Sequence, residues 1–286
     1  MAAILCDAAT SVPPVRIDGM SSIGTEREER IRWWHRLPRG RPVERHEALI
    51  EAARGRRVVH VGFVDELMAS KIAQEVWLHA RLAAVASSLV GLDSSEEGVA
   101  AARAEGYEAY VVDAQSAEAV RALGLAPADV VIAGEIIEHL DAPGPFLRAM
   151  HGAAPNLVLT TPNAYRLLNF LAPISGSELI HPDHTSWQSP STLRTLLERA
   201  GWEVERMAYY HNPTRRKVTG TTQERTVTHA QNAVRVVLAQ VNALVPYWSD
   251  GLVVWACEGQ TLAGEPRSSR PPGTQSGETY SSGSDG

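Results

Sequence analysis

The chain has 286 residues, of which 44% are hydrophobic and 21% are charged. These proportions are those of an ordinary globular protein, so they exclude wholesale disorder, a collagen-like chain and a continuous coiled coil. The formal net charge is −6, from 27 basic and 33 acidic residues. Because proteins that bind polyphosphate are usually basic, this charge disfavours nucleic acid as a partner.

Several features of the sequence point to a cytoplasmic location. No apolar run approaches the roughly 18 residues of a membrane span, so no integral membrane protein is expected. The opening segment, MAAILCDAATSVPP, lacks a basic flank and is a poor signal peptide. Cys6 and Cys257 are the only cysteines, which excludes a disulfide framework or a cysteine zinc site within one chain.

The two ends of the chain are expected to be disordered. Residues 261–286 are rich in Ser, Gly and Pro, so they cannot bury enough apolar surface to offset their ordering entropy. Residues 1–20 are expected to be disordered because chain ends often fray. Residues 21–56 are predicted to form a helical segment, with short helices at Glu26–Trp34 and Val43–Ala53, that packs on a core edge or covers a ligand.

Residues 57–260 alternate short apolar strands with amphipathic helices. This alternation predicts an α/β domain with a doubly wound, mostly parallel sheet of about seven strands and helices on both faces. The expected strands are Val58–Val61, Ser88–Asp93, Tyr107–Val112, Ala128–Ala133, Leu157–Thr161, Trp202–Tyr209 and Gly251–Cys257. The expected helices are Glu66–Val85, Ser94–Gly106, Ser116–Leu123, Pro145–His151, Ala164–Leu171, Ser189–Ala200 and Val227–Leu244.

The carboxyl ends of the strands are the expected ligand site, because ligands of open α/β sheets lie there. Gly62 follows the first strand, Asp93 ends the second and Asp113 follows the third. Asp93 can accept hydrogen bonds from both ribose hydroxyls of an adenosine ligand. The alternative is that Asp93 helps to cap the next helix, although Ser94 suits that role. Asp113 either accepts from an adenine amine or is an ordinary turn residue.

The turn after the first strand departs from the dinucleotide motif. G-x-G-x-x-G would need glycines at Val64 and Leu67, and Asp93 lies 31 residues beyond Gly62, against about 20 in dinucleotide folds. A nicotinamide dehydrogenase is therefore not expected. A ligand without phosphates needs only one close backbone approach, which Gly62 can provide.

Five segments carry a family resemblance: VVHVGF, LVGLDSS, VVDAQ, ADVVIAGEIIEHL and NLVLTTPN. In this order they resemble the successive motifs of class I S-adenosylmethionine-dependent methyltransferases, whose fold is Rossmann-like. The later segment HTSWQSPSTLRTLLERAGWEVERM resembles a part common in the small-molecule O-methyltransferases of that family. The resemblance extends from about Arg57 to Glu258 and implies S-adenosylmethionine as the cofactor.

The resemblance also implies roles for the matching positions. Gly62 would face the methionine part of the cofactor, Asp93 would hold the ribose, and Asp113 with Ala114 would hold the adenine. Gly134 and Glu135 would line the sulfonium end. The residues expected to contact the cofactor are His60, Gly62, Phe63, Asp93, Ser94, Asp113, Ala114, Gly134 and Glu135.

Two positions depart from the family pattern. The family usually has an acid where this chain has His60, and a second glycine where it has Val64. These departures could weaken cofactor binding. They support one alternative, a non-catalytic methyltransferase-like domain that acts as a partner module.

The segment EIIEH is the stretch richest in chemical groups. If it turns helically, Glu135 shares a face with Glu138 and His139, and a downstream HPDH stretch adds His184, with His181 in reserve. The metal ligands expected for Mg²⁺ or another divalent cation are Glu135, Glu138, His139 and His184. This pattern resembles the E-x-x-E-H plus distal histidine site of small-RNA 2′-O-methyltransferases and the E-x-x-E-H stretch of ubiquinone-pathway O-methyltransferases. The alternative is that Glu138 and His139 only shape the pocket through hydrogen bonds.

The predicted function is methyl transfer to an oxygen of a small molecule, a sugar or a natural-product scaffold. The expected catalytic residues are His139, Glu138 and His184, because a cation would lower the pKa of the acceptor hydroxyl and a histidine would take its proton. A metal-dependent RNA 2′-O-methyltransferase is the second hypothesis. Candidate acceptor-lining residues are Tyr165, Arg166, Trp187 and Tyr209. The sequence leaves the acceptor, the methylated atom and the oligomeric state open.

Overall fold

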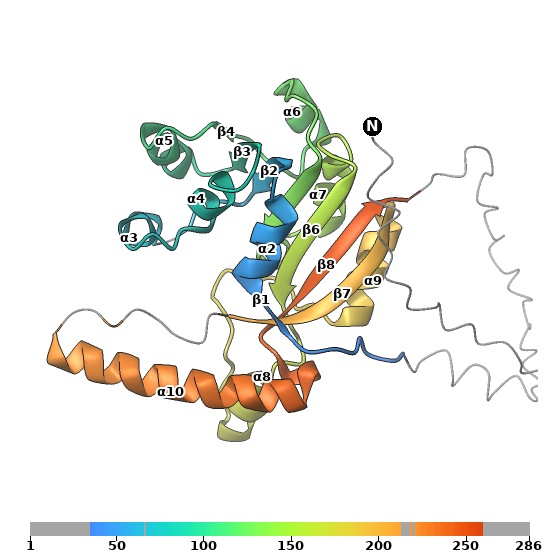
Figure 1. The fold of residues 1–286 in the computed structure, drawn as a ribbon. Coiled ribbons are helices and arrows are strands. Elements are labelled where there is room, and N and C mark those ends of the chain that lie inside the picture. The colour runs from blue at the N-terminus through green and yellow to red at the C-terminus, as the bar shows by residue number, and fades with distance from the viewer. Residues whose placement is uncertain (1–34, 66, 213–217, 219–220, 260–286) are drawn as a thin grey trace, which may run out of the picture.

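A computed structural model describes residues 35–65, 67–212, 218 and 221–259. In this part of the chain one eight-stranded sheet has the order β1-β7-β8-β6-β5-β2-β3-β4 (Figure 1). Its strands are β1 (Val43–Glu44), β2 (Arg57–Val61), β3 (Ser88–Asp93), β4 (Ala109–Val111), β5 (Val130–Gly134), β6 (Asn156–Pro162), β7 (Trp202–His211) and β8 (Gly251–Glu258). The predicted α/β fold is confirmed, with eight strands rather than about seven.

The sheet is parallel apart from β8, which runs antiparallel to both of its neighbours, β6 and β7. The additional strand is β1, whose Val43 pairs with Tyr210 at the end of β7. The helix predicted from Val43 therefore begins only at Arg45. Glu44 forms its N-cap, because its carboxylate accepts hydrogen bonds from the next backbone N–H groups.

Helices cover both faces of the sheet. They are α2 (Arg45–Ala53), α3 (Met68–Ala73), α4 (Leu78–Ala83), α5 (Glu96–Ala104), α6 (Ala117–Ala122), α7 (Pro143–Met150), α8 (Leu167–Leu171), α9 (Pro190–Arg199) and α10 (Thr222–Leu244), with 3-10 turns η1 (Ile137–His139), η2 (Ala172–Ser175) and η3 (Pro246–Trp248). On one face Leu49 of α2 and Leu82 of α4 pack in one cluster. On the other, Phe146 of α7 and Leu197 of α9 pack in another.

The central strands β2, β5 and β6 are mostly apolar because both of their faces are covered, with His60, Thr160 and Thr161 as buried polar exceptions. Successive side chains of a strand point to opposite faces. Val58 and Val130 accordingly join the cluster under α2, while Val59 and Val131 join the cluster under α7 and α9. This arrangement holds the carboxyl ends of β2 and β5 side by side.

The single helix predicted over Glu66–Val85 is wrong. The structure has α3 and α4, with a break in which Glu75 adopts a left-handed φ of +60°. Trp77 follows the break and is only 1% exposed. Its indole N–H donates to the carbonyl oxygen of Phe63 at 3.2 Å. Burying this large ring in the core offsets the helical hydrogen bonds that the break removes.

Four other helices begin at different residues from those predicted. Helix α7 begins at Pro143 rather than Pro145, and α8 begins at Leu167 rather than Ala164. Ser95, not Ser94, caps α5, since its hydroxyl oxygen accepts from the backbone N–H of Gly98 at 3.1 Å. Helix α10 begins at Thr222 rather than at Val227. Its extension comes from a capping box in which Thr221 and Glu224 bond to each other's backbone N–H.

Some predictions lie outside the described residues. They are the disorder of residues 1–20 and 261–286 and the helix at Glu26–Trp34. Among the helices that the structure does describe, none combines the length and the apolar character that crossing a membrane requires.

Candidate active site

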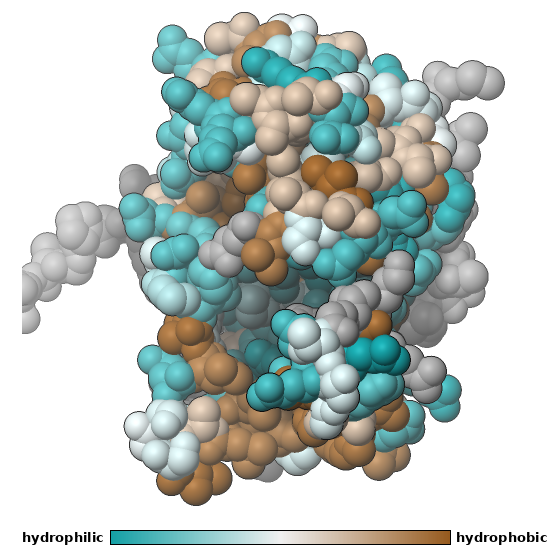
Figure 2. Space-filling model, turned by 90° about the vertical axis from the view of Figure 1, so that its left-hand side faces the viewer, coloured by the Kyte–Doolittle hydropathy of each residue, from teal (hydrophilic) through white to brown (hydrophobic). Residues whose placement is uncertain are grey.

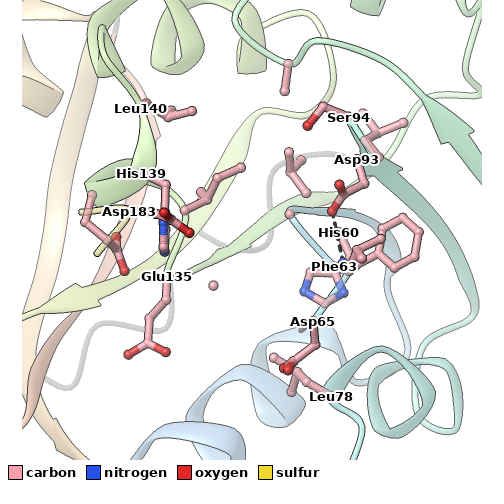
Figure 3. A pocket seen from close by; sticks show the side chains of 18 of the residues that line it. His60, Phe63, Asp65, Leu78, Asp93, Ser94, Glu135, His139, Leu140 and Asp183 are labelled. Carbon is pink, nitrogen blue, oxygen red and sulfur yellow. Dashed lines mark hydrogen bonds between the residues drawn. The ribbon is translucent and has the colours of Figure 1, made fainter. Parts of the chain in front are cut away.

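A cavity of about 880 Å³ lies at the carboxyl edge of the parallel strands (Figure 3). Its volume is in the usual range for small-molecule sites. It brings together all the residues predicted to contact a cofactor: His60, Gly62, Phe63, Asp93, Ser94, Asp113, Ala114, Gly134 and Glu135. It continues to Glu138, His139 and His184. The structure thus places these residues around one cavity, while their individual roles stay predictions.

The turn after β2 requires glycine at one position. Gly62 has a φ of +67°, and a Cβ there would lie 2.9 Å from Cδ1 of Ile136. Val64, which stands where the family has a second glycine, packs its side chain against Gly98 of α5. A Cβ at Gly98 would lie 2.3 Å from Cγ1 of Val64. A glycine on the neighbouring helix therefore makes room for the atypical valine.

Asp93 connects two segments of the cavity wall. Its Oδ2 accepts from the backbone N–H of Val64 at 2.9 Å, and its Oδ1 accepts from that of Ser95 at 3.0 Å. The bond to Ser95 agrees with the alternative that Asp93 helps to cap α5, whereas the bond to Val64 holds the turn after β2. Each carboxylate oxygen keeps a second lone pair, and Asp93 lies at the cavity wall (Figure 3).

Asp113 has the geometry of a turn residue. Its Oδ1 accepts from the backbone N–H of Gln115 at 2.9 Å, forming an Asx turn ahead of Ser116, the N-cap of α6. Asp113 and the buried Ala114 nevertheless both line the cavity. The turn therefore fixes the position of the carboxylate that was predicted to meet an adenine.

His60 stands where the family usually has an acid, and it is buried against His79. Their Nδ1 atoms lie 3.1 Å apart, and the two rings stack with centroids 5.3 Å apart. Burial, reinforced by His79, lowers the pKa of His60 well below its ordinary value, and burial lowers that of His79 to about 4. Both imidazoles are therefore neutral at pH 7. No pattern in the sequence pointed to His79, which lies inside the predicted long helix.

Glu135 takes part in an ion pair and a hydrogen bond that the sequence did not indicate. Arg45 Nη1 lies 3.3 Å from its Oε2, and the Tyr210 hydroxyl donates to its Oε1 at 2.5 Å. Arg45 Nε also donates to Oγ1 of Thr160 at 3.2 Å. Burial opposes ionisation of Glu135, but the guanidinium of Arg45, the Tyr210 hydrogen bond and two nearby histidines together outweigh it, so the pKa of Glu135 lies below its usual range.

The expected helical turn through EIIEH is only partly formed. η1 begins at Ile137, and Glu135 has a left-handed φ of +56°. This backbone reversal turns the Glu135 side chain toward Arg45. Glu135 therefore does not share a helical face with Glu138 and His139, and that prediction is wrong.

Glu138 is 1% exposed and lines the same cavity. Its Oε2 accepts from the hydroxyl of Thr161 at 3.0 Å, whereas Oε1 is buried without a hydrogen-bond partner among the described residues. Burial, with the nearby Glu135 carboxylate, raises the pKa of Glu138 to about 8. The group is therefore a neutral acid at pH 7 and can donate a hydrogen bond.

Three histidines converge at the end of the cavity beyond Glu138. The backbone N–H of Thr185 donates to the carbonyl oxygen of Glu138 at 2.8 Å, which fastens the HPDH loop to η1. The ring of His139 lies 4.6 Å from that of His184 and 5.6 Å from that of His181. Burial, and then the neighbouring imidazoles, lower the pKa of His139 and of His184. Both are therefore neutral bases at pH 7.

The predicted metal ligands do not come together as one set. Among the described residues, the group whose candidate ligand atoms all lie within 4.8 Å of one another is His139, His181 and His184. The Glu135 oxygens are engaged by Arg45 and Tyr210. Imidazole ligands suit Zn²⁺ and similar transition metals, whereas Mg²⁺ prefers oxygen. The donor set therefore fits Mg²⁺ poorly.

The four candidate acceptor-lining residues lie elsewhere: none of Tyr165, Arg166, Trp187 and Tyr209 lines the large cavity. Tyr209 is buried and packs against Tyr247 at a ring distance of 5.9 Å. Arg166 pairs with Asp250 at 3.2 Å and lines a smaller cavity of about 90 Å³.

The fold and the cavity together define an α/β domain with a ligand site at the carboxyl edge of its parallel strands. A family model described as "Methyltransferase domain" matches residues 30–206, more than half of the chain. The chain belongs to that family and is an S-adenosylmethionine-dependent methyltransferase.

Solved structures resemble the chain only distantly, and curated proteins gave no match. An S-adenosylmethionine-dependent methyltransferase from Archaeoglobus fulgidus is 18% identical, with 75% of this chain and 91% of that chain covered and a TM-score of 0.47. Magnesium protoporphyrin IX methyltransferase from Synechocystis, with bound SAH, is 14% identical, with coverages of 75% and 82% and a TM-score of 0.45. A small RNA methyltransferase is 14% identical, with coverages of 75% and 25% and a TM-score of 0.46. This similarity carries no argument about the acceptor.

Proposed function

We propose that the enzyme methylates a hydroxyl oxygen of a small, hydroxylated acceptor such as a sugar. The observation that carries this proposal is the composition of one cavity. Its far end holds the neutral bases His139 and His184 and the neutral acid Glu138, while its near end holds Gly62 and Asp93. Bound S-adenosylmethionine supplies an electrophilic methyl group on a positively charged sulfur.

The near end of the cavity fits the cofactor. Gly62 has no Cβ, so a ligand can approach its backbone closely. The free lone pairs of Asp93 suit the ribose hydroxyls, and Asp113 with Ala114 lies farther along the same wall. Glu135 is anionic through its pair with Arg45, so it favours a positive sulfonium nearby.

The far end can bind the acceptor and take its proton. As the acceptor oxygen forms its bond to the methyl carbon, the bond from that carbon to sulfur would break and S-adenosylhomocysteine would leave. The acceptor proton would pass to a ring nitrogen of His139 or His184. Either imidazole can accept it, because both are neutral at pH 7. Glu138, which lines the cavity as a neutral acid, would orient the acceptor by donating a hydrogen bond.

The lining of the far end combines polar and apolar groups. Beyond the imidazoles it includes the acidic Asp183 and the apolar Leu140 and Pro162, whereas the aromatic carbocycles of the cavity, Phe63 and Trp77, come from the segments after β2. A flat aromatic acceptor would find no ring to stack on beside His139 except imidazoles. The formal charge of −6 likewise disfavours RNA.

If the site holds a metal ion, the three imidazoles favour a transition metal such as Zn²⁺. His139, His181 and His184 would hold it. The metal, rather than a free imidazole base, would then activate the acceptor by lowering the pKa of its hydroxyl. We expect that activity lost to a chelator returns with Zn²⁺ and not with Mg²⁺. Restoration by Mg²⁺ alone would contradict this assignment, and indifference to the chelator would exclude the metal.

The decisive experiment separates cofactor binding from turnover. Calorimetry should detect S-adenosylhomocysteine binding to the wild type and not to Asp93→Ala. His139→Ala and His184→Ala should keep that affinity within about twofold, while the formation of S-adenosylhomocysteine over a panel of sugars and other polyhydroxyl compounds falls by about 100-fold. His229→Ala, in an exposed part of α10, is the matched control.

Two results would overturn the proposal. If the folded wild type binds neither S-adenosylmethionine nor S-adenosylhomocysteine, the domain is a non-catalytic partner module. If His139→Ala and His184→Ala are both fully active, these histidines only shape the pocket.

A further inference from the structure

Helix α10 presents its apolar side to solvent. Val227, Val234, Val237 and Leu244 are 50%, 58%, 62% and 85% exposed. Ala230, on the same side, is also exposed. A surface helix usually turns such residues toward the core, but the described part of the chain leaves this side of α10 uncovered.

The opposite side of α10, which faces the protein, carries both polar and apolar residues. Its half-buried or buried residues are the polar Thr228, Asn232, Arg235 and Asn242 and the apolar Val236, Leu238 and Ala239. Arg235, Ala239 and Asn242 line the small cavity that Arg166 lines from the start of α8. These contacts fix which side of the helix is covered within one copy of the chain.

The contacts within one chain stabilise α10 weakly. Among its 23 residues the structure buries only Asn242. Its sequence, TQERTVTHAQNAVRVVLAQVNAL, is rich in Thr, Val and Asn, which are mediocre helix formers. Since most helical stability in proteins comes from packing of an apolar face, that face calls for a partner.

The spacing of the exposed residues, together with the half-buried Val241, identifies the kind of partner. The positions Val227, Ala230, Val234, Val237, Val241 and Leu244 alternate steps of three and four residues. Such a repeat is the seam of a coiled coil, in which each side chain inserts between residues of a facing helix. The seam extends over about 26 Å of helix at roughly 1.5 Å per residue, so the complementary surface is another helix of similar length.

The residues beside the seam favour a second copy of the same helix. Thr226, Gln231, Ala233 and Gln240 flank it and carry no charge. Two copies therefore meet without like-charge repulsion, and no charged pattern selects a different partner. The helix also has no lysine and only two arginines, so it lacks the basic face of a membrane-surface helix.

Further apolar side chains lie beside α10. Phe170 and Leu171 of α8 and Ile174 of η2 are 52%, 48% and 82% exposed. Figure 1 places α8 next to α10 at the lower end of the molecule, and Figure 2 shows that end as largely hydrophobic. The exposed apolar surface is thus wider than one helix, as a stable interface requires.

We propose that two copies of the chain form a dimer through α10, with the seam at its centre and α8 at its rim. The same surface serves both copies, so the assembly closes at two subunits by a twofold axis. This interface lies outside the cavity described above and does not depend on the methyl acceptor.

Sedimentation equilibrium of the full chain over a concentration series tests the dimer. The wild type should have twice the monomer mass of 31.0 kDa. The double variant Val234→Glu and Val237→Glu should raise the dissociation constant at least ~100-fold, because dimerisation would bury two carboxylates in each copy. The control His229→Glu and Ala243→Glu adds the same charge away from the seam and should remain dimeric.

A second variant guards against misfolding. Val234→Ala and Val237→Ala removes apolar surface, adds no charge and favours the helix, and it should also weaken the dimer, with an unchanged circular dichroism spectrum. A wild-type mass of 31.0 kDa at every concentration would overturn the proposal. A dimer that persists in both seam variants would also overturn it, because its interface would then lie elsewhere.

Discussion

Glu138 shows how one residue can serve the site at a cost to the fold. It is nearly inaccessible to solvent, and one of its oxygens lacks a partner among the described residues. Its pKa is raised to about 8, first by burial and then by Glu135. A carboxyl group is kept neutral in this way when a hydrogen-bond donor is needed at pH 7.

Glu138 makes the stability of the protein depend on pH. Because its folded pKa of about 8 exceeds the ordinary value near 4.3, the native state binds more protons than the unfolded state between these values. The free energy of unfolding therefore falls as pH rises through this window. Glu138→Gln, which mimics the neutral acid, should match the wild type at pH 4.5 and exceed it on the order of 3 kcal/mol at pH 8.

Urea unfolding at several pH values measures this difference. Glu51→Gln, an exposed substitution on α2, is the control and should leave the pH profile unchanged. Parallel wild-type and Glu138→Gln profiles between pH 4.5 and 8 would show that Glu138 ionises normally.

Site residues could be predicted where they follow closely after a predicted strand, and could not where they contact the site from a distant part of the chain. Gly62, Asp93 and His139 could be predicted because each lies next to a strand end. Arg45 and Tyr210 could not, because they lie 165 residues apart along the chain and no local pattern connects either of them to Glu135. The left-handed φ of Glu135 was equally hidden, since it depends on those two partners.

At the scale of elements, α2 connects the edge strand β1 to the cavity. Its first residue, Arg45, has a side chain only 11% exposed and contacts Glu135 and Thr160. A Cβ at Gly134 would lie 3.0 Å from Nη2 of Arg45, so the end of β5 leaves room for the guanidinium. The position of α2 and the charge at the cavity wall are thus fixed by the same contact.

Removing this guanidinium should loosen α2 and leave Glu135 without a counter-charge. We expect Arg45→Met to lower the free energy of unfolding by about 2 kcal/mol, less than for a fully buried pair because Glu135 is partly exposed. Arg54→Met, at the other end of α2, breaks the exposed pair with Glu51 and should cost less than about 0.5 kcal/mol. Equal losses in chemical denaturation would contradict a special role for Arg45.

Strands were easier to predict than helix boundaries. Most residues of the central strands β2, β5 and β6 are apolar, as expected for strands that are covered on both faces. The predicted helix over Glu66–Val85 failed because its apolar spacing is also satisfied by two short helices around a buried Trp77. The strand β1 is two residues long, so it has no periodicity that a sequence could show.

At the scale of the whole molecule, buried histidines make the folded protein less stable at acidic pH. Burial, and then Arg45, lowers the pKa of His46 to about 4, while His79 has a similar value and His60 a strongly lowered one. The unfolded state therefore binds more protons than the native state between pH 4 and 6.5. The sign of this effect is that stability falls as pH falls through this window.

We expect the melting temperature of Glu138→Gln, which removes the opposing contribution of that acid, to fall steadily from pH 6.5 to pH 5. Most paired carboxylates titrate below this range, so the change reports on the histidines. NMR titration of the imidazole resonances provides the assignment. A flat profile with histidines that titrate near pH 6.5 would contradict the burial argument.

The overall plan could be inferred because alternating strands and helices allow few arrangements. The arrangement of residues 164–188 and α10 at the lower end of the molecule could not be inferred, because many apolar residues there do not pack on the sheet. The proposed dimer explains why α10 reads as amphipathic in sequence and yet lies with its apolar side outward.

Because β8 lies between β6 and β7, the sheet cannot be completed until β8 has been synthesised. Until the ribosome has made residues 251–258, β7 and β1 have no hydrogen-bonded link to the other strands. Secondary structure in the earlier half can form during translation, but closure of the sheet has to follow it. Nascent chains stalled before residue 251 should therefore depend on chaperones, whereas released chains should not.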